Sequence, residues 1–66
     1  MKLRLNKTLY SYEAISASVD AFSEIATIIV REEDKYWVCY FTHSKYDLEE
    51  TRKEFENYVI GCVNAL

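Results

Sequence analysis

The sequence predicts a small α+β domain in which a short strand, a helix, a β-hairpin and a second helix follow one another. Alternating apolar and polar residues predict the strands, and apolar residues at helical spacing predict the two helices. The chain has 66 residues with one glycine and no proline, which leaves no room for a linker. We therefore expect one domain that spans residues 1–66.

The first half of the chain begins with a strand and continues into a helix. Residues 2–6, KLRLN, predict a half-buried strand, because Leu3 and Leu5 share one face and the polar residues share the other. Ser11 is a residue type that caps helices, and the helix predicted after it runs to about Phe22.

Residues 23–31 and 35–42 predict a hairpin of two strands. We expect Arg31 to pair with Tyr36, which places both strands in a single register. One face then carries Ala26, Ile28, Val30, Trp37, Cys39 and Phe41. The other face carries Ile25, Ile29, Tyr36, Val38 and Tyr40. Both faces are therefore apolar, although a two-layer domain covers only one.

The last predicted helix starts after Asp47, which with Glu50 has the spacing of a capping box. Its expected core stripe consists of Leu48, Phe55, Val59, Cys62, Val63 and Leu66. Tyr58 and Ile60 are apolar as well but lie off this stripe. We expect them to be exposed.

Two strand orders are compatible with these elements. We favour the order with residues 35–42 in the centre, antiparallel to both neighbours, because this strand is the most apolar on both faces. Both helices then cover one face, as in a truncated ferredoxin-like unit without its final strand. Residues 2–6 keep one edge unpaired.

Composition excludes several classes of function. The net charge is −3 and there is no basic patch, which argues against nucleic-acid binding. The start MKLRLNK lacks the apolar segment of a signal peptide, and no apolar stretch is long enough to span a bilayer. We therefore expect a cytoplasmic protein without a membrane segment.

The chain offers little for catalysis or for a cofactor. Cys39 and His43 share a strand face, but at strand spacing their Cα atoms lie about 13 Å apart. Cys39 is expected to be a buried thiol; the alternative is a disulfide or metal site shared with Cys62. The two cysteines fit no zinc spacing, and no glycine-rich loop exists to hold phosphate. We predict no enzyme, no cofactor and no metal.

The surplus of apolar surface instead predicts a binding surface. The residues expected to contact a partner are Ile25, Ile29, Tyr36, Val38, Tyr40, Leu3, Leu5, Tyr58 and Ile60. Two occupants remain open: a protein or peptide partner, which could also add to the open edge of residues 2–6, and a second copy of the chain in a homodimer.

Three short motifs lie at or within the predicted helices. A helix start of the form Y-S-x-x-A-I appears as Tyr10, Ser11, Ala14 and Ile15. A helix end appears as Phe22, Ser23 and Glu24, and an acidic closing helix carries Glu54, Phe55 and Asn57. These motifs resemble the small D component of the His-Xaa-Ser systems, HxsD, and the resemblance covers nearly the whole chain.

The resemblance implies an accessory role in the maturation of a ribosomally made peptide by radical S-adenosylmethionine (SAM) partners. It brings no catalytic residue to this chain, because the family has none to carry over. Two separated cysteines also cannot supply the four thiolates that an iron–sulfur cluster needs. We therefore expect a non-catalytic protein-binding module, or alternatively a self-associating structural or regulatory protein with no part in peptide modification.

Overall fold

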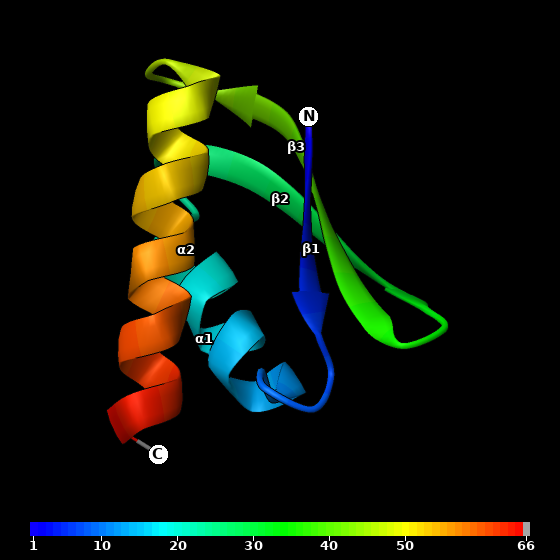
Figure 1. Cartoon of the computed structure of the whole chain (residues 1–66). Coiled ribbons are helices and arrows are strands. Elements are labelled where there is room, and N and C mark those ends of the chain that lie inside the picture. Colours follow the sequence, from blue (N-terminus) through cyan, green and yellow to red (C-terminus); the bar gives the residue numbers. More distant parts are fainter. Residues whose placement is uncertain (66) are drawn as a thin grey trace.

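Three strands and two helices make up the part of the chain that a computed structural model describes, residues 1–65 (Figure 1). They follow in the order β1 (Lys2–Asn6), α1 (Tyr12–Ala21), β2 (Ala26–Glu33), β3 (Tyr36–Ser44) and α2 (Leu48–Ala65). The sheet order is β1-β3-β2 and both pairings are antiparallel, which confirms the predicted α+β fold with β3 in the centre. Both helices lie on the same side of the sheet (Figure 1).

Helix α1 starts at its predicted cap and packs closely on α2. The Ser11 Oγ accepts a hydrogen bond from the backbone N–H of Ala14 at 3.2 Å, as an N-cap does. Ala14 and Ser18 are fully buried, and the Ser18 hydroxyl lies 3.7 Å from the Cys62 Sγ on α2. Small side chains one turn apart allow the two helices to approach each other.

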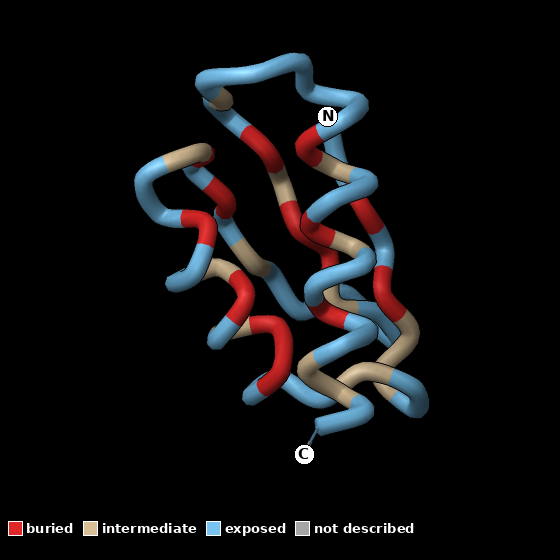
Figure 2. The backbone as a smooth tube through the Cα atoms, turned by 90° about the vertical axis from the view of Figure 1, so that its left-hand side faces the viewer, coloured by how far each residue is buried: buried red, intermediate tan, exposed pale blue. Residues whose placement is uncertain are grey.

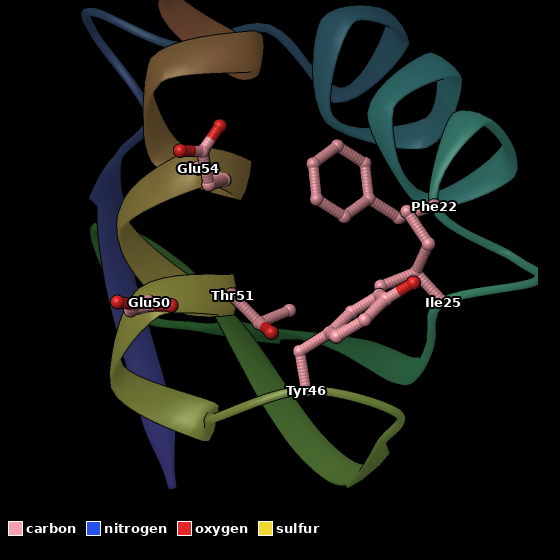
Figure 3. A pocket seen from close by; sticks show the side chains of 6 residues that line it. All are labelled: Phe22, Ile25, Tyr46, Glu50, Thr51 and Glu54. Carbon is pink, nitrogen blue, oxygen red and sulfur yellow. The ribbon is translucent and has the colours of Figure 1, made fainter.

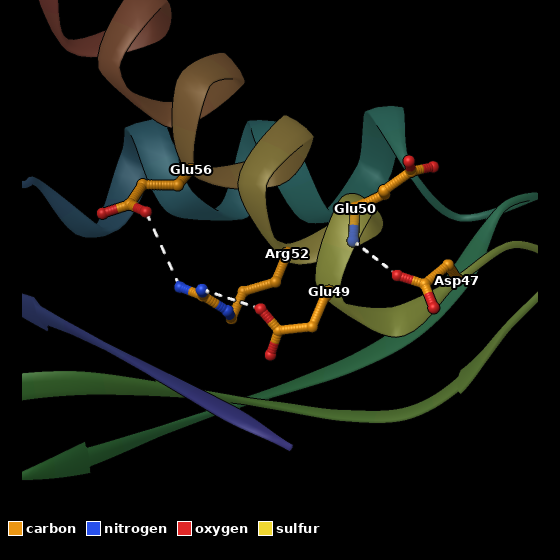
Figure 4. Close-up of polar contacts among 5 residues, drawn as sticks. All are labelled: Asp47, Glu49, Glu50, Arg52 and Glu56. Atoms are coloured by element: carbon orange, nitrogen blue, oxygen red, sulfur yellow. Dashed lines mark hydrogen bonds and ion pairs between the residues drawn. The ribbon is translucent and has the colours of Figure 1, made fainter.

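The start of α2 shows half of the predicted capping box (Figure 4). The Asp47 carboxylate accepts a hydrogen bond from the backbone N–H of Glu50 at 3.1 Å. Along the helix, Arg52 forms ion pairs with Glu49 at 3.2 Å and with Glu56 at 3.9 Å. Such solvent-accessible pairs contribute little to stability, so α2 depends on its buried face.

The core lies between the helices and one face of the sheet (Figure 2). Phe55 is its centre, because its ring meets the rings of Phe22 and Phe41 edge-on, with centroids 5.4 Å apart in both cases. The buried core cluster comprises Leu3, Leu5, Ile15, Phe22, Ala26, Ile28, Cys39, Phe41, Phe55 and Val59. The predicted stripe of α2 is confirmed for Phe55 and Val59, whereas Leu48 is exposed and Leu66 lies outside the described residues.

The predicted register of the hairpin is wrong by two residues. Arg31 pairs with Val38 rather than with Tyr36, and Tyr36 pairs with Glu33. The turn therefore begins at Asp34, which has a positive φ of 56°. The favoured two-residue hairpin turns need a positive φ at their first central residue, and aspartate adopts one more readily than most residues. A slip of two residues leaves the side chains of the paired residues 28–31 and 36–41 on their predicted faces.

Ile25 does not lie on the uncovered sheet face, where it was predicted. It belongs to a tight turn after α1, in which the carbonyl of Phe22 accepts hydrogen bonds from the backbone N–H groups of Ile25 and Ala26, both at 2.9 Å. The strand begins only at Ala26, and a bulge between Thr27 and Ile28 interrupts its register. Ile25 packs instead against the core cluster.

Candidate binding surface

The sheet face turned away from the helices, here called the open face, has no helix packed on it within residues 1–65 (Figure 1). Strand alternation places on it Lys2, Arg4 and Asn6 of β1, Thr27, Ile29, Arg31 and Glu33 of β2, and Tyr36, Val38, Tyr40 and Thr42 of β3. It therefore carries four of the nine residues predicted to bind a partner: Ile29, Tyr36, Val38 and Tyr40.

The apolar residues of the open face are not equally accessible. Ile29 is 44% exposed and Tyr36 is 39% exposed, whereas Val38 is 0% exposed. The cross-strand neighbours of Val38 are Arg4 and Arg31. Arginine can cover apolar neighbours with its aliphatic stem, which accounts for the burial of Val38 without a helix above it. Val38 is therefore not accessible to a partner, which would contact Ile29 and Tyr36 instead.

Polar contacts organise the rest of the open face. The Arg4 guanidinium lies 5.8 Å from the centroid of the Tyr36 ring, within the range of a cation–π interaction. The Tyr40 hydroxyl donates a hydrogen bond to the Glu33 carboxylate, and this bond raises the pKa of Tyr40. Beside them is a hollow of about 280 Å³, lined by Ile29, Arg31, Tyr40 and Thr42.

The outer edge of β1 presents free backbone groups next to the open face. The ladder ends with a bond from the Phe41 N–H to the Met1 carbonyl at 2.9 Å and one from the Lys7 N–H to the Lys35 carbonyl at 3.0 Å. Antiparallel strands bond through every second residue, so odd-numbered residues of β1 bond to β3. The N–H and C=O groups of Lys2 and Arg4 therefore point outward, where residues 1–65 provide no further strand.

Leu3 and Leu5 were predicted to contact a partner, but the structure places them elsewhere. Both side chains are buried in the core cluster, and their backbone groups face β3. The residues that form the free edge are Lys2 and Arg4. We call these two residues, with their outward backbone groups, the β1 edge. Sequence alternation separates the side chains of Lys2 and Arg4 from those of the leucines, but only the pairing with β3 shows that their backbone groups point outward.

A second hollow lies on the helix side of the molecule (Figure 3). It measures about 200 Å³ and is lined by Phe22, Ile25, Tyr46, Glu50, Thr51 and Glu54. The apolar side chains gather on one side of it and the α2 residues on the other (Figure 3). Tyr58 lies next to this region, since its ring meets that of Phe22 with centroids 5.7 Å apart. Ile25 and Tyr58 are therefore remote from the open face.

Ile60 belongs to a third place. It is exposed near the C-terminal end of α2 and lines a hollow of about 340 Å³ together with Leu9, Tyr10, Val63 and Asn64. The predicted binding residues thus do not form one surface. The structure groups those of the open face, buries the leucines of β1, and distributes the remaining three over the helix side.

The two cysteines are free, and Cys39 lies in the core with 0% exposure. Burial raises the pKa of the Cys39 thiol to about 11, which favours the unreactive protonated form at neutral pH. Cys62 is half-buried and His43 is exposed. Within residues 1–65, no three histidine, cysteine or acidic side chains form a group that could hold a metal ion.

Fold and surface together define a small α+β domain with one uncovered sheet face and a free strand edge beside it. No helix among the described residues is both long and apolar enough to cross a membrane. Comparison of the chain with protein-family models, with curated proteins and with solved structures finds no match. The resemblance to the D component of the His-Xaa-Ser systems stays a prediction.

Proposed function

We propose that the protein is a non-catalytic module that binds an extended segment of a partner protein or peptide along the β1 edge. One observation carries this proposal: the N–H and C=O groups of Lys2 and Arg4 point outward at the edge of the sheet. An extended peptide can bond to such groups as an additional strand. Ile29 and Tyr36 on the adjoining open face supply apolar contact area.

The role we propose for this binding is assistance in the maturation of a ribosomally made peptide. The resemblance to the D component of the His-Xaa-Ser systems supports this role, with radical SAM proteins as partners that carry out the chemistry. The burial of Cys39 is consistent with a chain that does not itself hold an iron–sulfur cluster. In this proposal the partners are cytoplasmic proteins or peptides.

A display library of random nonapeptides tests the binding site and requires no identified partner. Peptides selected on the folded protein are titrated into isotopically labelled protein, and the backbone amide signals are followed by nuclear magnetic resonance (NMR). We expect the largest shifts at Lys2, Leu3 and Arg4. Selected peptides that shift only residues of α1 or α2 would refute the proposed edge.

A proline substitution separates the backbone of Arg4 from its charge. The N–H of Arg4 points away from β3, so Arg4→Pro removes an outward donor and leaves the ladder to β3 intact. Arg4→Ala is the matched control, because it removes the charge but retains the N–H. We expect Arg4→Pro to weaken the selected peptides more than Arg4→Ala does. Equal weakening by the two variants would contradict strand addition.

A second candidate is a self-associating structural or regulatory protein. The exposure of Ile29 and Tyr36 on the open face favours it, because two such faces could cover each other in a homodimer. Light scattering tests this alternative. A tight dimer that Tyr40→Glu abolishes, with no loss of peptide binding, would favour self-association through the open face and leave that face no part in partner binding.

A further inference from the structure

We propose that the strand bound at the β1 edge is acidic, with Asp or Glu side chains at the alternate positions that lie on the open face. This inference rests on the proposed function and specifies the chemistry of its partner. It follows from the charges at the edge, from the geometry of strand addition and from the pairing that these charges disfavour.

The first step concerns the cations of the open face. Lys2 and Arg4 of β1 are exposed, and Arg31 of β2 lies on the same face of the sheet. None of the three forms an ion pair within residues 1–65, where the ion pairs join Lys7 to Glu32 and Arg52 to Glu49 and Glu56. Glu33 lies on the same face, where it accepts the hydrogen bond of Tyr40, and its negative charge offsets one of the three cations. A chain with a net charge of −3 therefore carries two cations without an ion pair, Lys2 and Arg4, at the β1 edge, and a third, Arg31, across β3 on β2.

The second step concerns what an added strand would meet there. Residues directly opposite each other on antiparallel strands have Cβ atoms about 5 Å apart and share a face. The two partner residues opposite Lys2 and Arg4 would therefore point to the open face. A carboxylate at either position can pair with the cation beside it. The intervening partner residues would point to the helix side of the sheet, the side on which Leu3 and Leu5 are buried.

The third step compares an acidic partner strand with a second copy of the chain as the occupant of this edge. If two β1 edges paired in antiparallel fashion, Arg4 would lie opposite Arg4, or opposite Lys2 after a shift of register. Like charges directly opposite each other destabilise a pair of strands. Cations on edge strands commonly prevent such self-pairing. Lys2 and Arg4 thus disfavour self-association at this edge and favour an acidic partner strand.

The test uses three nonapeptides, acetylated and amidated, in which valine alternates with glutamate, glutamine or lysine. Dissociation constants come from the NMR shifts of the Lys2, Leu3 and Arg4 amides. We expect the glutamate peptide to bind about two- to thirtyfold more tightly than the glutamine peptide, and the lysine peptide to bind most weakly. Salt at about 0.5 M should reduce this preference, because exposed charges are screened.

Charge reversal at the edge should reverse the order of the peptides. We expect Lys2→Glu combined with Arg4→Glu to bind the lysine peptide most tightly. Lys45→Glu combined with Lys53→Glu is the matched control, since it changes the net charge equally at exposed residues outside the sheet. This control should keep the preference for the glutamate peptide.

The outcomes separate this inference from the proposed function. Equal affinities for the three peptides, with shifts at the β1 amides, would overturn the acidic partner and leave strand addition intact. No shift at these amides with any of the peptides, including those selected by display, would overturn both. Shifts of the same amides that grow with protein concentration alone would indicate self-pairing and would also overturn the inference.

Discussion

The two faces of the sheet reach burial in different ways, and the neighbours Cys39 and Val38 on β3 show the difference. Both are 0% exposed, but Cys39 lies in the core cluster under the helices and Val38 lies on the open face. The helices form a fixed layer over Cys39. Val38 is surrounded by side chains of the sheet itself, and its cross-strand neighbours are Arg4 and Arg31. Equal burial therefore does not imply equal rigidity, and substitutions should distinguish the two faces.

The largest effect is expected at the centre of the covered face. Phe55→Ala removes the ring that meets both Phe22 and Phe41, and we expect a loss of about 3–5 kcal/mol in the free energy of unfolding. A domain of this size has only about 3–10 kcal/mol in total, so much of the variant should be unfolded. Urea unfolding followed by circular dichroism measures the loss. A loss below about 1 kcal/mol would mean that Phe55 is not the centre of the core.

A matched pair of valines compares the faces directly. Val59 of α2 and Val38 of β3 are both 0% exposed, and truncation to alanine removes the same atoms from each. We expect Val59→Ala to cost about 2–3 kcal/mol, since helices and sheet hold the resulting cavity open. Val38→Ala should cost about 1–2 kcal/mol, because the side chains around it on the open face have no helix to hold them and can move inward. Urea unfolding of both variants provides the test, and equal losses would show that the open face is as rigid as the core.

Alternation and helical periodicity were sufficient to predict the order of the elements and the central position of β3. They also placed Tyr36, Val38 and Tyr40 on the correct face, because a face depends only on whether a residue is odd or even along the strand. The register depends on the turn, and a turn displaced by one residue shifts the pairing by two and fits the same alternation. The observed pairing of Glu33 with Tyr36 decides between the two turns.

The candidate site was less predictable than the fold. Ile25 follows a β-branched pattern, but hydrogen bonds to the carbonyl of Phe22 keep it in the turn after α1. Whether the backbone groups of Lys2 and Arg4 are free depends on which residues of β1 bond to β3. Only the three-dimensional pairing of the strands determines this. The burial of Val38 likewise depends on long side chains of two other strands. No local pattern contains these relations.

The buried thiol of Cys39 on the covered face should make the free energy of unfolding depend on pH. Its pKa rises from 9.0 to about 11 through burial, so the unfolded chain loses this proton first when the pH increases. Between pH 9 and 11 the unfolded state therefore binds fewer protons than the folded state, and the free energy of unfolding falls. We expect this thiol to account for a loss of about 1 kcal/mol at pH 10. The measurement compares the slope of stability against pH with that of Cys39→Ala, which should be shallower; equal slopes would show that burial does not shift this group.

The smallest effect is expected on the open face, where Tyr40 donates its hydrogen bond to Glu33 at the solvent-accessible surface. The bond holds the proton on the phenol, so the pKa of Tyr40 lies above its usual value of 10.0. Glu33→Ala should lower this pKa, because it removes both the acceptor and the neighbouring negative charge. An NMR titration of the Tyr40 ring detects the change, and Glu32→Ala on the opposite face of β2 is the control. An unchanged pKa of Tyr40 in Glu33→Ala would mean that water accepts the hydrogen bond of Tyr40 as well as Glu33 does. Stability below pH 9 should hardly change in either case, because exposed polar contacts exchange one solvated partner for another.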